Sequence, residues 1–403
     1  MGEGDETGRS EGRIVATITA SHVAQHLFTG SSILYPSIKD DLALSYTQIG
    51  LMIGVVNILG GFLQMIYSIA GRRVSRRILL GASNLLMSLG CLITGIADRF
   101  EALIAGNAIS GVGQAGTHPV SSSILGSKYQ ARGIGSALSI FYGLGYVGNI
   151  VSPLLLSSIA ASAGWRSAFN LLALIFLVAA VLVFIGLRGE PAAEKAISKG
   201  SGRRLVDDIR SALRVRGAVP ILVAQAFISG GTGMGVMTTW VPVYLRDASK
   251  GLALSVFDAG VVTSVATIGG VLGTIYLGRL ADRRGYLRTA TLSLATTTTT
   301  TIFLLTLYQG FNPVLVPHLF ILSMTTFSLS SIMQAHLASS AGPGERDILL
   351  GLFFTFGFGV SSLWSTLLGA LIDSYSFNAV WLAMVGAGIA AQICLLYASR
   401  RSP

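Results

Sequence analysis

The run Leu171-Leu-Ala-Leu-Ile-Phe-Leu-Val-Ala-Ala180 is apolar throughout and shows no alternation of polar and apolar residues. Strands of a transmembrane barrel alternate over segments of about 10 residues, whereas a helix needs about 20 apolar residues to cross the hydrocarbon core. The run lies inside a longer apolar stretch, 166–187. This stretch therefore predicts a transmembrane helix.

Similar apolar stretches recur along all 403 residues. Hydrophobic residues make up 52% of the chain and charged residues only 11%, against about 25% charged residues in an ordinary soluble domain. The sequence therefore predicts an all-α membrane protein with twelve transmembrane helices. The predicted spans are 14–36, 48–69, 78–97, 101–126, 133–160, 166–187, 218–245, 256–277, 287–308, 314–340, 347–372 and 377–398.

The net charge of +10 is spread over short clusters between the apolar runs, a pattern that favours membrane topology over nucleic-acid binding. With the N-terminus inside, 23 of the 28 Lys and Arg residues fall on the cytoplasmic side and 5 on the outer side. Cytoplasmic loops retain positive charge, so both termini are predicted to be cytoplasmic. The polar tail 1–11 lacks the basic region of a signal peptide, so the first apolar run is expected to stay as a helix. We expect the protein to reside in the plasma (cell inner) membrane.

One long polar stretch, 188–217, divides the predicted spans six and six. Within it, Leu205, Val206, Ile209 and Leu213 recur at helical spacing among basic residues, which predicts an amphipathic helix on an anionic membrane surface. A regulatory role for this helix is the alternative. The predicted organisation is a cytoplasmic tail at 1–12, a six-helix bundle at 13–187, a linker at 188–217 and a second six-helix bundle at 218–403.

An internal repeat supports the division into halves. Leu42-Ala-Leu-Ser45 recurs 210 residues later as Leu252-Ala-Leu-Ser255, in each case directly before an apolar span. Ser45 and Ser255 each begin a capping-box pattern, with Gln48 and Asp258 three residues further on. The second and eighth predicted helices are therefore expected to start with equivalent chemistry.

After the eighth span, the segment Gly278-Arg-Leu-Ala-Asp282-Arg283-Arg-Gly285 closely resembles the signature loop of the major facilitator superfamily. The resemblance implies two pseudo-symmetric six-helix bundles with a solute pathway between them, and a cytoplasmic gating loop formed by Gly278, Asp282, Arg283 and Gly285. Physically, the two glycines permit a tight turn and a close helix approach, and Asp282 can cap a helix N-terminus. The alternative is a basic loop that sets only topology. The corresponding first-half loop keeps its basic residues but lacks the acid.

Three short matches in the first half are similar to the fosmidomycin-resistance branch of efflux proteins within that superfamily. They are Ser21-His22, the segment 46–51, and Gly116-Thr-His118-Pro119, although Val120 follows where that branch usually has an acid. This resemblance implies proton-linked efflux. Asn107 stands where many proton-coupled members carry an arginine, which favours a uniporter or importer instead.

The glycine-rich segment 143–153 in the fifth span is similar to an exporter motif that ends in a proline. Small residues also permit close helix packing in lipid, and this structural interpretation stands beside the functional one.

All five histidines fall in spans one, four and ten, which the family resemblance places around the central cavity. His22 and His26 share a helix face by their i, i+4 spacing, and Gln114 and His118 lie on a stripe of the fourth span. Histidines exchange protons near neutral pH, so we predict that they couple protons to solute movement. Neutral hydrogen bonding between helices is the alternative. The candidate pathway residues are His22, Gln25, His26, Asn107, Gln114, His118, Asn149, Gln225, His336 and Trp364.

No charged residue lies near the middle of a predicted span, which favours a neutral or weakly ionised solute. The sequence contains no nucleotide-binding loop and no metal or nucleophile constellation, and Cys91 and Cys394 are expected to be free thiols. We therefore predict a secondary transporter that works by alternating access, not an enzyme, without cofactor or metal. Its expected partners are a small solute, protons and the lipid bilayer, and a monomer is expected. A transporter-like sensor is the alternative outside transport.

Overall fold

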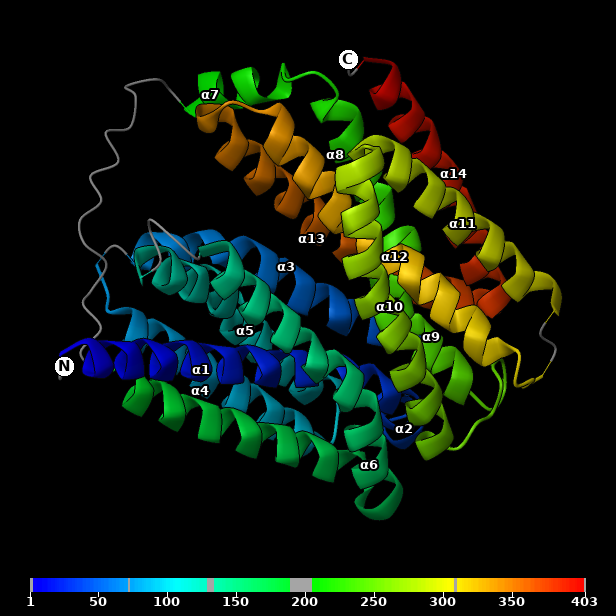
Figure 1. The fold of residues 1–403 in the computed structure, drawn as a ribbon. Coiled ribbons are helices and arrows are strands. Elements are labelled where there is room, and N and C mark those ends of the chain that lie inside the picture. The colour runs from blue at the N-terminus through cyan, green and yellow to red at the C-terminus, as the bar shows by residue number, and fades with distance from the viewer. Residues whose placement is uncertain (1–2, 72, 129–133, 189–204, 308–309, 402–403) are drawn as a thin grey trace. The chain divides into compact units, whose positions relative to one another are not determined.

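The computed structural model describes residues 3–71, 73–128, 134–188, 205–307 and 310–401. In these ranges every regular element is a helix (Figure 1). Eight of the described helices are long and apolar enough to cross a membrane, which confirms the class of helical membrane protein. Whether the chain crosses twelve times stays a prediction.

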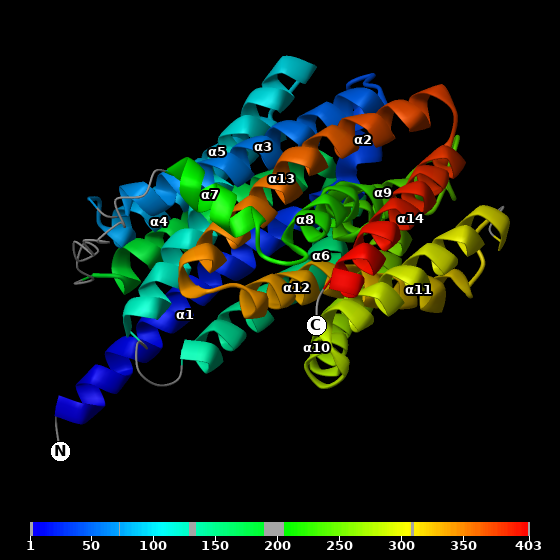
Figure 2. The ribbon, with the colours of Figure 1, turned by 90° about the horizontal axis from the view of Figure 1, so that it is seen from above.

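Contacts within the chain define two units, one of residues 1–38 with 55–198 and one of residues 39–54 with 199–403. In the first unit, α1 packs along α6, and α4 packs against α5 and α6 (Figures 1 and 2). Two helices contribute to both units, α2 at Tyr35–Asp41 and α3 at Tyr46–Ala70. The other first-unit elements are α1 Glu3–Thr29, the 3₁₀ turn η1 Gly30–Leu34, α4 Arg76–Gly95, α5 Phe100–Lys128 and α6 Ile134–Gly186.

The 53-residue helix α6 is interrupted at Gly164, whose backbone has φ 81° and ψ 165°. Residues with a Cβ rarely adopt this conformation, so glycine is the residue suited to this change of direction. The interruption falls between the predicted spans 133–160 and 166–187. α6 therefore consists of the two predicted helices, joined by a bend at Gly164.

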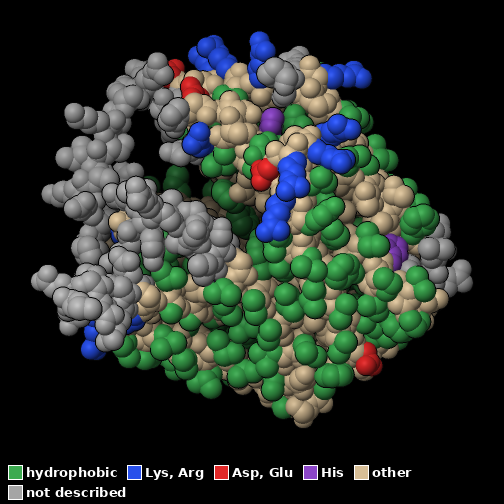
Figure 3. All heavy atoms as spheres, in the orientation of Figure 1, with side chains coloured by type: hydrophobic (Ala, Val, Ile, Leu, Met, Phe, Trp, Pro, Cys, Tyr) green, Lys and Arg blue, Asp and Glu red, His purple; other side chains and the backbone are tan. Residues whose placement is uncertain are grey.

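In the described part of the second unit, the short helix α7 is followed by seven helices, α8 to α14. α7 lies beside α13 (Figure 2), and Ser211 on α7 donates a hydrogen bond to Glu345 on α13 at 3.2 Å. Figure 3 shows Lys and Arg side chains gathered at the end of this unit that carries α7 and the C-terminus, while hydrophobic side chains cover its middle. The elements are α7 Leu205–Leu213, α8 Ala218–Phe227, the π-helical turn η2 Ile228–Thr232, α9 Met234–Arg246, α10 Val256–Arg284, α11 Tyr286–Leu307, α12 Leu315–Ser340, α13 Pro343–Ser374 and α14 Phe377–Arg401.

The predicted amphipathic helix is present as α7. Ala212 is fully buried against the unit, while Leu213 is 38% exposed and therefore lies on the outer surface of α7. The side chains of Leu205 and Val206 lie outside the described residues. Binding of this helix to a membrane surface stays a prediction.

The backbone repeats together with the sequence. Ala43 and Ala253, which are 210 residues apart, are the two described non-glycine residues with positive φ, at 50° and 53°. Each precedes a serine N-cap: the amide of Gln48 donates to Ser45 Oγ at 3.1 Å, and the amide of Asp258 donates to Ser255 Oγ at 3.1 Å. The reciprocal bond of a capping box, from the Ser45 amide to Gln48 Oε1, is also present at 2.9 Å. At the second start the Ser255 hydroxyl instead donates to Asp258 Oδ2 at 2.6 Å. The expected equivalence of the two serine caps is confirmed, while the reciprocal bonds differ.

Candidate functional site

Two glycines of α6 set the distance between α6 and α1. A Cβ placed on Gly145 would collide with the ring of His22, and one placed on Gly148 would lie 2.7 Å from the Cβ of His26. Real Cβ contacts do not come this close, so both positions require glycine for this packing. The structural interpretation of the glycine-rich segment is therefore supported, and its consequence is that two histidines are pressed against α6.

His22 and His26 are joined directly. Their Nε2 atoms are 3.0 Å apart, within hydrogen-bond distance, and their ring centroids are 4.6 Å apart. His22 is fully buried, whereas His26 is partly exposed. The shared helix face predicted from the i, i+4 spacing is confirmed, and it brings the two rings into a single hydrogen-bonded pair.

His118 on α5 completes a cluster of three imidazoles. Its ring centroid lies 5.0 Å from that of His22 and 6.4 Å from that of His26, with edge-on geometry in both cases. Next to the cluster, Gln25 donates from Nε2 to the carbonyl of Gln114 at 3.2 Å. The two stripes predicted from the sequence therefore meet inside the first unit.

The Nδ1 atoms of the two histidines each face a polar group of α6. His22 Nδ1 lies 3.0 Å from the carbonyl oxygen of Phe141, and His26 Nδ1 lies 3.0 Å from Oδ1 of Asn149. His22 also stacks on the Phe141 ring at a centroid distance of 4.1 Å. Asn149 was expected in the solute pathway, and the structure shows it as a direct neighbour of His26.

The remaining candidates do not join this cluster. Asn107 donates from Nδ2 to the carbonyl of Leu103 at 2.9 Å and lies 3.4 Å from the hydroxyl of Thr94, so it contacts the backbone of its own helix α5 and a side chain of α4. In the second unit, His336 faces the ring of Tyr286 at 6.4 Å.

Gln225 and Trp364 lie around the π-helical turn η2. Ser330 donates to Gln225 Oε1 at 3.3 Å, and Trp364 donates from Nε1 to the carbonyl of Ala226 at 2.9 Å. A Cβ on Gly231 in η2 would come within 2.8 Å of the Trp364 indole. π-Helical turns often mark functional positions, which keeps these two residues as candidates for solute contact.

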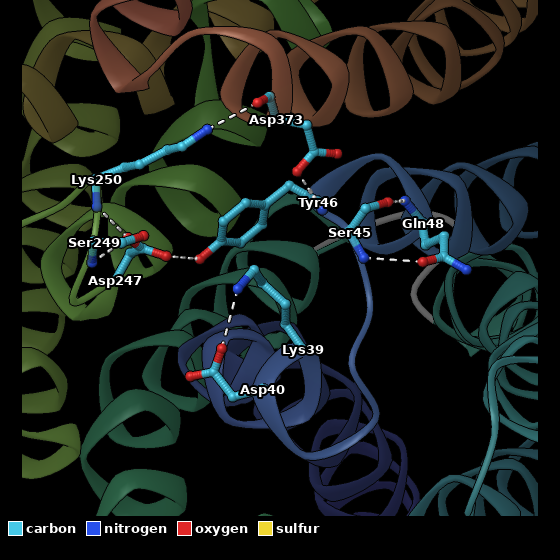
Figure 4. Close-up of polar contacts among 9 residues, drawn as sticks. All are labelled: Lys39, Asp40, Ser45, Tyr46, Gln48, Asp247, Ser249, Lys250 and Asp373. Carbon is cyan, nitrogen blue, oxygen red and sulfur yellow. Dashed lines mark hydrogen bonds and ion pairs between the residues drawn. The ribbon is translucent and has the colours of Figure 1, made fainter.

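The sequence did not reveal a polar cluster in the second unit that joins Tyr46, Asp247 and Asp373 (Figure 4). Tyr46 donates its hydroxyl to Asp247 Oδ2, while its amide donates to Asp373 Oδ1 at 2.9 Å. Thr47 donates to Asp373 Oδ2 from both its amide and its hydroxyl, each at 2.7 Å. Lys250 donates from Nζ to the carbonyl of Asp373 at 2.9 Å. Asp373 therefore caps the N-terminus of α3 from the end of α13.

Asp247 lies just beyond α9 and is only 4% exposed. Burial alone would raise the pKa of this carboxyl, but hydrogen bonds from the Tyr46 hydroxyl, the Lys250 amide and the hydroxyl and amide of Ser249 outweigh burial and hold the pKa below its ordinary value. Asp247 is therefore an ionised anchor for the segment that follows α9.

The predicted gating loop has the expected turn but not the expected close helix packing within the second unit. Gly285 has φ +95° and ends α10, which confirms the tight turn. The expectation of a close helix approach at Gly278 is wrong for the described part of the second unit, because a Cβ there would meet no atom within 4 Å. Asp282 is exposed and accepts a hydrogen bond from the Tyr286 hydroxyl at 2.9 Å.

Among the described residues, no group of three or more His, Cys, Asp or Glu side chains has the arrangement of a metal site. Cys91 and Cys394 are free thiols, as expected. Imidazole rings form hydrogen bonds and exchange protons near neutral pH, which the histidine cluster is therefore able to do.

Comparison with known proteins agrees with the fold. A family model described as Major Facilitator Superfamily matches residues 20–366 and 248–403. The chain is 29% identical over 265 residues to an MFS-type efflux pump of Mycolicibacterium smegmatis, covering 62% of this chain and 58% of the pump.

It is also 24% identical over 371 residues to the fosmidomycin resistance protein of Escherichia coli K12, covering 91% and 88% of the two chains. A crystal structure of the nucleoside transporter NupG superimposes with a TM-score of 0.76 at 12% identity, covering 96% of this chain and all of the other. Its family is therefore settled: the chain belongs to the major facilitator superfamily.

Proposed function

We propose that this protein is a secondary transporter that exports a small, neutral or weakly ionised solute in exchange for protons, by alternating access. The observation that supports proton coupling is the cluster of His22, His26 and His118 inside the first unit. Ionisable groups inside a membrane are costly, and they are concentrated in proton and solute pathways.

The proposed direction of transport and the proposed class of solute rest on further observations. One relative is named an efflux pump and another a resistance protein, which favours export. No charged residue lies near the middle of a predicted span, and a strongly ionic solute would there lack a countercharge. A solute without a fixed charge suits this interior.

A uniporter or importer is the second candidate. It is favoured by Asn107, which stands where proton-coupled members often carry an arginine and which bonds to Leu103 and Thr94. In that case the three histidines would serve as neutral hydrogen-bonding groups between α1, α5 and α6.

The test begins with a thermal-shift screen of a small-molecule library against the purified protein. The solute that raises the melting temperature most is then loaded into proteoliposomes, and its flux is measured with and without an imposed pH gradient. We expect the gradient to drive flux in the wild type, the His26→Gln variant to lose this drive, and the His318→Gln variant to keep it. His318 lies in the second unit, bonded to the carbonyl of Thr300 at 2.8 Å, and so controls for loss of any histidine. Equal wild-type flux with and without the gradient would exclude proton exchange and favour the uniporter.

A further inference from the structure

We propose that His22, His26 and Asn149 act as one unit that holds a single excess proton, and that Asn149 reverses its carboxamide when this proton binds or leaves. The proposal deepens the proposed proton exchange by assigning its stoichiometry at this pair and a positioning residue. It rests on which atoms are able to donate and which are able only to accept.

The Phe141 carbonyl is able only to accept a hydrogen bond. His22 Nδ1, at 3.0 Å from this oxygen, must therefore carry a proton. In a neutral ring, the other nitrogen of His22, Nε2, is then an acceptor. His26 Nε2 lies 3.0 Å from it and must donate. A neutral pair therefore has His22 protonated at Nδ1 and His26 protonated at Nε2.

This neutral pattern determines the orientation of Asn149. His26 Nδ1 is left as an acceptor, so the atom of Asn149 that faces it must be the amide nitrogen. The structure instead places Oδ1 at 3.0 Å from His26 Nδ1, and the Asn149 Nδ2 atom is buried with no hydrogen-bond partner. This orientation requires a proton on His26 Nδ1.

With Asn149 Oδ1 facing His26, the number of N–H protons on the two imidazole rings gives the charge of the pair. His22 Nδ1 carries one proton, the two Nε2 atoms share a second, and His26 Nδ1 carries a third. Two neutral imidazoles carry two protons between them, so three protons make the pair singly positive. The two amide orientations therefore correspond to the two charge states, whichever of them is occupied at a given pH.

The pair has no place for a second excess proton. Both Nε2 atoms would then carry hydrogens that point at each other across 3.0 Å, and the bond between the rings would be lost. Uptake takes one proton from water and release returns it; no other covalent bond changes, and the hydrogen bond between His26 and Asn149 reverses its direction.

The groups around the two histidines also favour a limit of one excess proton. Among the described side chains, the ionisable groups in ring contact with the pair are His118 on α5, with its centroid 5.0 Å from His22, and Tyr146 on α6, with its ring 5.5 Å from His26. Neither supplies a negative charge at neutral pH, so the carboxamide oxygen of Asn149 and the carbonyl of Phe141 are the groups that stabilise the added charge.

The deciding measurement is NMR of full-length protein labelled with ¹⁵N-histidine in detergent micelles, because the chain contains only five histidines. Signals are assigned by single His→Gln variants. At high pH we expect His22 in the Nδ1-protonated form and His26 in the Nε2-protonated form. On lowering the pH, one proton should add to the pair and His22 Nδ1 should stay protonated throughout. Finding His26 protonated only at Nδ1 at high pH, or two protons adding to the pair, would overturn the proposal.

Variants of Asn149 test its positioning role. A carboxylate is able only to accept, so Asn149→Asp should move the midpoint of the pair's titration up by about 1 to 3 pH units. Asn149→Leu removes the acceptor and should move the midpoint down. Asn170→Asp places the same acid on an exposed position of α6 in the first unit and should leave the midpoint where it is in the wild type. An unchanged midpoint in both Asn149 variants would contradict the role of Asn149.

The outcome is separable from that of the flux test. Wild-type flux that ignores a pH gradient, together with the expected NMR pattern, would reject proton exchange but keep the one-proton pair. Gradient-driven flux with the opposite ring protonation would keep proton exchange but reject the pair as its carrier.

Discussion

At the scale of single residues, the missing side chains of Gly145 and Gly148 matter as much as the imidazoles they face. The two glycines bring α6 so close to α1 that the polar groups of Phe141 and Asn149 reach the two rings. Without that approach, His22 and His26 would still share a helix face, but the pair would lack its two end groups.

We therefore expect Gly145→Ala to displace His22 and to destabilise the protein by about 1 to 3 kcal/mol, the usual cost of adding a methyl group to a packed interior. Gly143→Ala is the matched control, because a Cβ there meets no atom within 4 Å. Thermal unfolding of both variants in the same detergent measures the difference. Equal melting temperatures for the two variants would show that α1 and α6 do not pack as described.

Some contacts of these residues could be predicted from the sequence, and others could not. The i, i+4 spacing was enough to place His22 beside His26, because both lie on one helix. It could not predict that Asn149 would bond to His26, because that contact joins residues 123 positions apart and depends on how α6 packs. Gly278 failed for the same reason, since its surroundings are set by other helices.

At the scale of elements, local rules worked best at helix ends. The serine caps at Ser45 and Ser255 and the turn at Gly285 were predicted correctly, because each depends on a few neighbouring residues. The cap that Asp373 provides for α3 was missed, since it lies more than 300 residues away along the chain. The only sequence signal was an acid at the end of an apolar span.

The anchor at Asp247 carries a pH prediction. Its pKa is lower in the folded protein than in the unfolded chain, so its stabilising contribution is fully present above the unfolded value of about 3.9 and is lost as the pH falls through the lower folded value. The amides of Ser249 and Lys250, which donate to Asp247 Oδ1 at 2.9 and 2.5 Å, should lose protection over the same range.

Hydrogen–deuterium exchange, corrected for the intrinsic effect of pH, checks this expectation. Tyr46→Phe removes one hydrogen bond that lowers the pKa of Asp247, so the loss of protection should begin at a higher pH. Tyr375→Phe, at a tyrosine that is 71% exposed, is the control and should behave as the wild type. An onset that is the same in Tyr46→Phe and wild type would contradict the anchor.

At the scale of the whole molecule, the charge count makes a firm prediction about sidedness. The 23-to-5 distribution of Lys and Arg predicts that Arg214 is cytoplasmic and that Arg99 lies outside. Single cysteines at these two positions, in a background with Cys91 and Cys394 replaced by alanine, should react with a membrane-impermeant thiol reagent from opposite sides of the membrane. Reaction of both from the same side would show that the number of crossings between them is even.

The one-proton limit of the His22–His26 pair also has an electrical consequence. Exchange of one proton for an uncharged solute moves one net charge across the bilayer in each cycle, so the membrane voltage as well as the pH difference would drive it. A potential of 100 mV is equivalent to about 2.3 kcal/mol per charge, or a concentration ratio of about 50-fold, and each unit of pH difference adds a further factor of about ten. The number of protons held between two imidazole rings thus sets an upper bound on how steep a solute gradient this protein would maintain.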